Sequence, residues 1–139
     1  MLEHLTSTNR PAADEALAHM ENTFGALPAD YRALLAATDG CGLSGFKTPL
    51  DVFSVREVLA LHREHDLYTR VPQSLIFGGD GGGVLFAFDL RPGRAQRVFA
   101  ILQEDACFSP DAYERLLFEG STLTDLLARI VNGEKLNAA

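Results

Sequence analysis

The sequence predicts an α+β fold, in which a single antiparallel or possibly mixed sheet is flanked by helices. Apolar residues recur at helical spacing in four stretches, at residues 11–25, 27–40, 54–66 and 122–131. Between the third and the fourth stretch the pattern changes to short apolar strands separated by turn residues. No strand–helix unit repeats along the chain, which argues against a parallel nucleotide-binding sheet.

One domain is expected for residues 1–139, because a linker would leave two units too small to bury a core. The chain is 47% hydrophobic and 22% charged, an ordinary composition for a globular protein. The N-terminus has no basic run followed by an apolar block, and no stretch approaches the ~20 apolar residues that cross a bilayer. We therefore expect a cytoplasmic protein.

The first two helices each begin near a proline and end at a glycine. Pro11 and Pro28 suit the first turn of a helix, where a backbone N–H is not needed. Gly25 and Gly40 can adopt the left-handed conformation that closes a helix. The second helix carries one apolar stripe, formed by Leu27, Tyr31, Leu34 and Leu35.

The third helix follows a glycine-containing segment. Residues 41–50 predict a loop, and residues 50–53 a short extended piece. Ser54 and Glu57 then form a capping-box pattern, in which the serine accepts from the backbone and the glutamate reaches back. This pattern predicts a helix that runs to about residue 66.

Three strands are expected in the second half of the chain, at residues 74–77, 84–90 and 96–102. The glycine-rich segment 78–83 connects the first two, and the turn residues 91–94 connect the next two as an antiparallel hairpin. Alternate residues of the middle strand should face opposite sides of the sheet, with Val84, Phe86, Phe88 and Leu90 on one side and Leu85, Ala87 and Asp89 on the other.

The C-terminal third begins with polar sequence and ends with a clear helix. Residues 104–110 predict a polar loop that contains Phe108, and residues 111–118 predict one or two helical turns. Residues 122–131 place five apolar side chains on one helix face, and Gly133 ends that helix.

The glycine-rich segment 78–83 has two interpretations. Successive backbone N–H groups without side chains can cradle a phosphate. However, the segment lacks the Gly-Lys-Ser/Thr of a P-loop, and a strand rather than a helix follows Gly83. A strand-to-strand turn with positive φ angles is the preferred interpretation, and a small-ligand or nucleotide-binding regulatory domain is the alternative.

No catalytic or metal-binding pattern stands out. No serine lies in a Gly-x-Ser-x-Gly elbow, and His62 and His65 lack the spacing of a zinc protease motif. Cys41 and Cys107 lie far apart and form no metal-ligand pair, so two reduced thiols are expected, although sequence alone leaves a disulfide open. We therefore expect no enzymatic activity, no cofactor and no metal.

Charge is distributed unevenly along the chain. The 19 acidic residues outnumber the 12 basic ones and give a net charge of −7, which argues against nucleic acid and against an anionic membrane surface as partners. Two windows hold most of the surplus, one with Asp14, Glu15, Glu21 and Asp30, the other with Glu104, Asp105, Asp111, Glu114, Glu119 and Asp125. These windows are either a solvated surface or a recognition face for a basic protein.

Four motifs follow one another along residues 24–131. They are Leu27-Pro28-x-Asp30-Tyr31 followed by Leu34-Leu35 and Asp39-Gly40; the glycine-rich segment 76–83 before a strand ending at Asp89; Val98-Phe99; and Ser121-Thr122-Leu123 before Leu126-Leu127. In this order they resemble the SMI1/KNR4 family, also called the SUKH superfamily. The departures from the family pattern are Asp39 in place of the commoner asparagine, Val84 where many members carry a polar residue, and the absence of tryptophan.

The resemblance implies a non-enzymatic domain that works by binding another protein. Bacterial members of the family are widely regarded as immunity proteins that neutralise toxins, often nucleases, and fungal members regulate the cell wall through protein contacts. A basic toxin domain would explain the acidic surplus, and the candidate protein-binding residues are Asp80, Glu104, Asp105, Asp111 and Glu114. An orphan regulatory scaffold of the same family is a further alternative.

Overall fold

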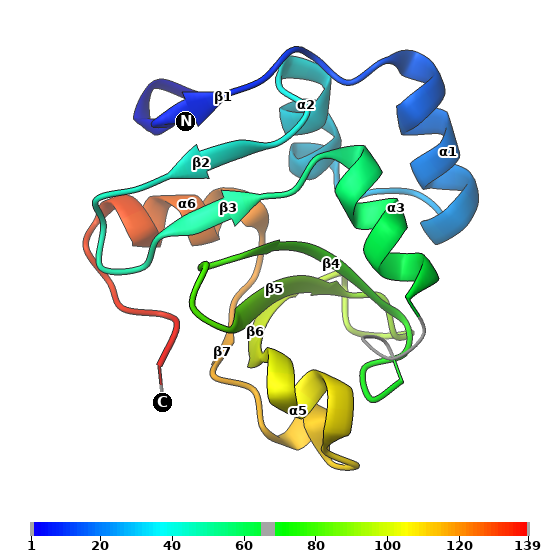
Figure 1. Cartoon of the computed structure of the whole chain (residues 1–139), viewed down its shortest axis with the longest axis vertical. Coiled ribbons are helices and arrows are strands. Elements are labelled where there is room, and N and C mark those ends of the chain that lie inside the picture. Colours follow the sequence, from blue (N-terminus) through cyan, green and yellow to red (C-terminus); the bar gives the residue numbers. More distant parts are fainter. Residues whose placement is uncertain (1, 65–68, 139) are drawn as a thin grey trace.

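The computed structural model describes residues 2–64 and 69–138 and contains one seven-stranded antiparallel sheet whose strand order follows the order of the chain (Figure 1). The predicted α+β class is confirmed, and each strand pairs antiparallel with its neighbour. The strands are β1 (Ser7–Thr8), β2 (Cys41–Leu43), β3 (Leu50–Val52), β4 (Ser74–Gly79), β5 (Val84–Asp89), β6 (Val98–Leu102) and β7 (Phe118–Glu119).

The four helices expected from apolar spacing are present. They are α1 (Asp14–Phe24), α2 (Ala29–Ala37), α3 (Val55–Arg63) and α6 (Leu123–Val131). The capping box of α3 is confirmed, because the Glu57 N–H donates to Ser54 Oγ at 3.2 Å and the Ser54 N–H donates to Glu57 Oε1 at 3.1 Å. This helix ends at Arg63, and most of its predicted continuation, together with His65, lies outside the described residues.

The prediction of a loop over residues 41–50 is wrong at its start, where β2 pairs with β1 on one side and with β3 on the other. The glycine at the centre of β2 is the reason that the sequence did not indicate a strand. A Cβ on Gly42 would lie 2.6 Å from Ser7 Oγ, so any other residue there would require the serine side chain to rotate away.

The polar loop predicted for residues 104–110 is also wrong, since α5 (Gln103–Phe108) occupies most of it. A single fully buried residue, Ala106, fixes this six-residue helix to the sheet, which is too little for a visible apolar period. The helical turns predicted for residues 111–118 reduce to the 3₁₀ helix η2 (Ala112–Glu114), after which the chain enters β7. A second 3₁₀ helix, η1 (Leu2–His4), opens the described chain.

Strand boundaries differ from expectation by two residues at β6 and β4, and β3 and β5 each end one residue earlier than expected. β6 begins at Val98 because Ala95 and Gln96 have φ angles of 54° and 53°, a left-handed conformation that a strand cannot contain. β4 extends through Gly78 and Gly79, where a Cβ on Gly78 would lie 2.5 Å from the carbonyl oxygen of Asp51. The turn between β4 and β5 is therefore shorter than the glycine run suggests.

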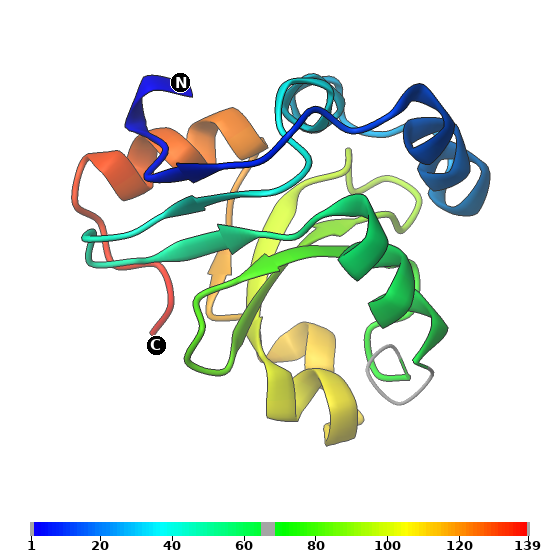
Figure 2. The ribbon, with the colours of Figure 1, turned by 45° about the horizontal axis from the view of Figure 1, so that its top comes forward.

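The two faces of the sheet carry layers of different thickness (Figure 2). We call α1, α2, α3 and α6 the major layer, because their apolar side chains share one buried cluster with Phe77, Phe86 and Phe88 of the sheet. We call α5 and η2 the minor layer; they contribute Ala106 and Ala112 to a second cluster on the opposite face. Figure 2 shows α1, α2 and α6 above the sheet and α5 below it. The alternation predicted for β5 is confirmed, since Leu85 and Ala87 belong to the second cluster.

Candidate functional site

The minor layer follows directly from the sheet, because α5 starts at the residue after β6. Its first N–H, on Gln103, donates to the carbonyl oxygen of Gly83 at 2.8 Å and so joins the helix to the β4–β5 turn. Ala106 and Ala112 are fully buried beneath the layer, where a small side chain lets the backbone approach the strands closely. The layer therefore lies close to the sheet, and its exposed larger side chains, such as Glu104, Phe108 and Glu114, point away from it.

The ion pair of Asp89 and Arg91 holds the other end of the minor layer, through Tyr113, against the end of β5. The Arg91 guanidinium donates to both carboxylate oxygens of Asp89, at 3.0 and 2.7 Å, and lies 3.6 Å above the centre of the Tyr113 ring. Burial, together with the negative charge of Asp89, raises the pKa of Tyr113 to about 12, and its hydroxyl donates to the carbonyl oxygen of Pro72. Burial acts to raise the pKa of Asp89, but the hydrogen bonds from Arg91 outweigh it and hold that pKa below its usual value.

Four of the five candidate residues lie together on the minor layer. Glu104 and Asp105 are in the first turn of α5, Asp111 precedes η2, and Glu114 ends it. We call these four residues the acidic face. At 3.6 residues per turn, Glu104 lies about 160° around the helix from the buried Ala106, so its side chain points into solvent.

Two of the four carboxylates are held in place by neighbours. Ser109 Oγ donates to Asp105 Oδ1 at 2.7 Å, and Arg115 Nε donates to Asp111 Oδ1 at 2.8 Å. The hydrogen bond from Arg115 lowers the pKa of Asp111. Glu104 and Glu114 are exposed. The acidic face thus combines two exposed glutamates with two aspartates whose carboxylates are held by hydrogen bonds, one of them from the Arg115 guanidinium.

Asp80, the fifth candidate residue, does not lie on the acidic face. Its carboxylate accepts hydrogen bonds from the N–H groups of Gly82 and Val84, at 2.7 and 3.0 Å, and from Asn137 Nδ2 at 2.8 Å. Burial would raise the pKa of Asp80, but these hydrogen bonds together lower it. Asp80 therefore joins the β4–β5 turn to the C-terminal segment.

The hydrogen bonds of Asp80 argue against the interpretation of the glycine-rich turn as an anion-binding site. Gly81 and Gly83 have φ angles of 78° and 101°, as expected for a strand-to-strand turn. The N–H groups of Gly82 and Val84, which could hold a phosphate, already bind the carboxylate of Asp80. An anion would have to displace a fixed negative charge from this turn.

The acids of the first window lie on the opposite side of the sheet, in the major layer. Asp30 accepts from the N–H and the hydroxyl of Thr124, at 2.9 and 3.0 Å, and so joins α2 to the start of α6. Glu21 pairs with Arg32 at 3.2 Å. The two acidic windows therefore do not form one face, and Asp125, from the second window, lies on α6 in the major layer.

Phe108 is the residue of this region whose exposure the sequence did not reveal. Its side chain is 74% exposed, whereas none of the other eight phenylalanines is classed as exposed. The one signal available beforehand was an aromatic residue inside an acidic, otherwise polar segment. Knowing that residues 103–108 form a helix is what places Phe108 beside Glu104.

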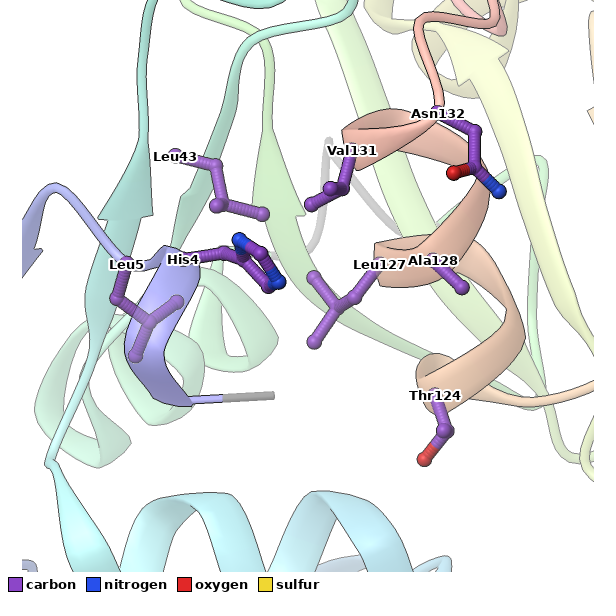
Figure 3. A pocket seen from close by; sticks show the side chains of 8 residues that line it. All are labelled: His4, Leu5, Leu43, Thr124, Leu127, Ala128, Val131 and Asn132. Carbon is purple, nitrogen blue, oxygen red and sulfur yellow. The ribbon is translucent and has the colours of Figure 1, made fainter.

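An apolar pocket of about 320 Å³ lies elsewhere, between the N-terminal segment and α6 (Figure 3). His4, Leu43, Leu127 and Val131 point toward its centre from three different elements, while the Thr124 hydroxyl points away (Figure 3). The pocket is on the major-layer side and is separate from the acidic face.

Groups capable of metal or thiol chemistry are sparse. Within residues 2–64 and 69–138, no three His, Cys, Asp or Glu side chains gather as a metal site would require. Cys41 and Cys107 form no disulfide, and burial, with a smaller contribution from Asp51, raises the pKa of the Cys41 thiol to about 11. In the same part of the chain, none of the helices has the length and apolar character needed to span a membrane.

These features define a small α+β domain whose prominent surface is a charged helical layer. The family model of the SMI1 / KNR4 family (SUKH-1) matches residues 11–129, and the chain belongs to this family. The resemblance seen in the four motifs is thereby confirmed. A comparison with curated proteins gives no match.

Proposed function

We propose that this protein is a non-enzymatic binding domain, an immunity protein that neutralises a basic toxin domain through its acidic face. The observation that carries the proposal is the gathering of Glu104, Asp105, Asp111 and Glu114 on the minor layer. Arg115 is the single basic residue between residues 104 and 125, so the negative potential of this layer is little compensated.

The physical effect of such a face is to steer a basic partner into place. Complementary charge raises the association rate by about 10- to 1,000-fold at low ionic strength. A nuclease binds phosphates through basic side chains, so carboxylates seated on that cleft would exclude the substrate. No chemical step by the immunity protein is required.

The alternatives receive less support. A small-ligand or nucleotide-binding role at the glycine-rich turn conflicts with the carboxylate of Asp80, which occupies the backbone N–H groups that such a ligand would need. A regulatory scaffold would use the acidic face in the same way but for a partner other than a toxin. Family membership is compatible with that role, and the genes that neighbour this one distinguish the two.

The proposal is tested by reading the neighbouring genes for a toxin domain and purifying that domain in a catalytically inactive form; a neighbourhood that encodes no toxin domain would count against the proposal. The association of the toxin domain with the wild-type protein is compared with that of Glu104→Lys/Asp105→Lys and, as matched control, of Asp14→Lys/Glu15→Lys. Both variants reverse two adjacent acids in the first turn of a helix, and both change the net charge by the same amount.

We expect the α5 variant to slow association by about 10-fold or more at low salt, and the α1 variant to slow it by less than about 2-fold. Equal slowing by both variants would show that only the net charge matters. Absence of binding by the wild-type protein would remove the toxin-binding role.

A further inference from the structure

Phe108 is exposed without any function in the fold. Its layer is held to the sheet by Ala106 and Ala112, and by the contact of Tyr113 with Arg91. The phenylalanine itself keeps 74% of its surface in solvent at the end of α5. Most of this aromatic ring is therefore solvated by water, and its burial contributes little to the stability of the described structure.

The ring lies within the acidic face. Glu104 and Phe108 are four residues apart on α5, so their side chains are neighbours on the helix surface. Phe108, like Glu104, is about 160° around the helix from Ala106 and points away from the sheet. Asp105 precedes it by one helical turn, and Asp111 follows at the entry to η2, each held by its own hydrogen bond.

Building on the function proposed above, we infer that Phe108 is the apolar anchor of the acidic face and that it inserts into an apolar pocket of the basic toxin domain. Aromatic side chains at the centre of an interface, surrounded by polar groups that exclude water, carry a large share of binding energy. The surrounding carboxylates act as a charged rim that pairs with basic side chains around the pocket. The carboxylates thereby set the association rate of the partner, and Phe108 sets its dissociation rate.

Charge favours this partner over two others. A second copy of the chain would bring two acidic faces together, which repel each other. An anionic membrane would receive the aromatic ring but would repel the carboxylates that surround it. A basic protein surface with an apolar pocket satisfies both the ring and its rim.

The inference predicts different kinetic effects for the ring and for its rim. In surface-immobilised binding to the inactive toxin domain, we expect Phe108→Ala to raise the dissociation rate by about 30-fold or more, the range of an interface hot spot. Its association rate should change by less than about 2-fold, since no charge is altered. Phe108→Leu, which keeps an apolar side chain, should dissociate at a rate between those of the wild type and Phe108→Ala.

Leu102→Ala is the matched control. Leu102 is the other exposed large apolar residue among those described, 40% exposed, and it ends β6 on the opposite face of the sheet from α5. Its removal should leave both rates unchanged. Thermal unfolding of each variant confirms that the fold is intact, and Phe108→Leu provides a second reading should Phe108→Ala be poorly folded.

The outcomes separate the inference from the proposed function. Wild-type binding with slowed association of Glu104→Lys/Asp105→Lys, but an unchanged dissociation rate for Phe108→Ala and Phe108→Leu, would overturn the anchor and leave the acidic face in place. Absence of wild-type binding would overturn both. A dissociation rate raised equally by Leu102→Ala would also overturn the anchor, because it would show no preference for Phe108.

Discussion

The two layers on the sheet use their residues in opposite ways. The major layer buries leucine, methionine, tyrosine and valine side chains against the aromatic residues of the sheet. The minor layer buries two alanines fully and leaves its phenylalanine and its glutamates in solvent. Since burial of large apolar side chains is the dominant favourable contribution to folding, the major layer stabilises the fold. The minor layer contributes less burial, and under the function proposed above its exposed residues contact the partner.

The acidic residues repeat this contrast. Asp30 in the major layer receives three hydrogen bonds, from the Tyr31 N–H and from two groups of Thr124. Glu104 in the minor layer is exposed. Acidic side chains thus form hydrogen bonds within the fold in the major layer, whereas Glu104 in the minor layer is left in solvent.

The largest loss of stability predicted by this contrast is seen by comparing two phenylalanines, one in each environment. Phe88 is fully buried, with its ring 4.5 Å from the centre of the Phe77 ring and 5.0 Å from that of Tyr31. We expect Phe88→Ala to lower the free energy of unfolding by about 3–5 kcal/mol, because it removes apolar contacts and leaves a cavity.

Phe108→Ala, the same change on the minor layer, should lower the free energy of unfolding by less than about 0.5 kcal/mol. Urea titration followed by circular dichroism measures both values. Comparable losses for the two variants would mean that the minor layer stabilises the fold as much as the major layer does.

The next largest loss of stability is expected from breaking the Asp89–Arg91 ion pair beside the minor layer. Asp89 is 4% exposed and receives two hydrogen bonds from the Arg91 guanidinium. We expect Asp89→Asn to lower the free energy of unfolding by about 1–3 kcal/mol, because the amide cannot replace the charged acceptor. Asp111→Asn, which removes an exposed pair with Arg115, is the control and should leave the free energy of unfolding nearly unchanged.

The Asp89 pair also predicts a pH dependence. The pKa of the Asp89 carboxyl is lowered in the folded state, so as the pH falls this group takes up a proton in the unfolded chain before it does so in the folded protein. The contribution of Asp89 is fully present above the unfolded pKa of about 3.9 and is lost as the pH falls through the lower folded value. The free energy of unfolding measured from pH 6 to pH 2 should therefore fall less steeply for Asp89→Asn than for the wild type; parallel curves would contradict this.

The smallest effect separates the acids of the two layers. We expect Asp30→Ala to lower the free energy of unfolding by about 1 kcal/mol, since it removes the acceptor at the start of both α2 and α6. Glu104→Ala should change it by less than about 0.5 kcal/mol. Chemical denaturation under identical conditions compares the two variants, and an equal loss of stability for both would show that Glu104 supports the fold as much as Asp30 does.

How far the fold could be predicted depended on the size of each element. α6 places Leu123, Leu126, Leu127 and Ile130 in the core, and such a stripe is visible in sequence. β1 and β7 have two residues each, too few to show any alternation. α5 has a single buried residue, and its acids resemble those of a polar loop.

The sequence allowed the acidic residues of the candidate site to be identified, but it did not show which of them share one surface. Counting charge identified Glu104, Asp105, Asp111 and Glu114, because their surplus is local in sequence. Their separation from Asp80 and from the first acidic window depends on which face of the sheet each segment covers. The exposure of Phe108 depends on its helical angle to Ala106, which no count of residues supplies.

The sequential strand order has a consequence for how the chain folds. β4, β5 and β6 are joined by connections of 80–83 and 90–97, so their pairing requires the closure of short loops only. The contact of Asp30 with Thr124 joins residues 94 positions apart and can form only when the two ends of the chain have been brought together. Substitutions in β4–β6 should therefore slow folding, whereas Asp30→Ala should mainly accelerate unfolding, as expected for a contact made after the transition state.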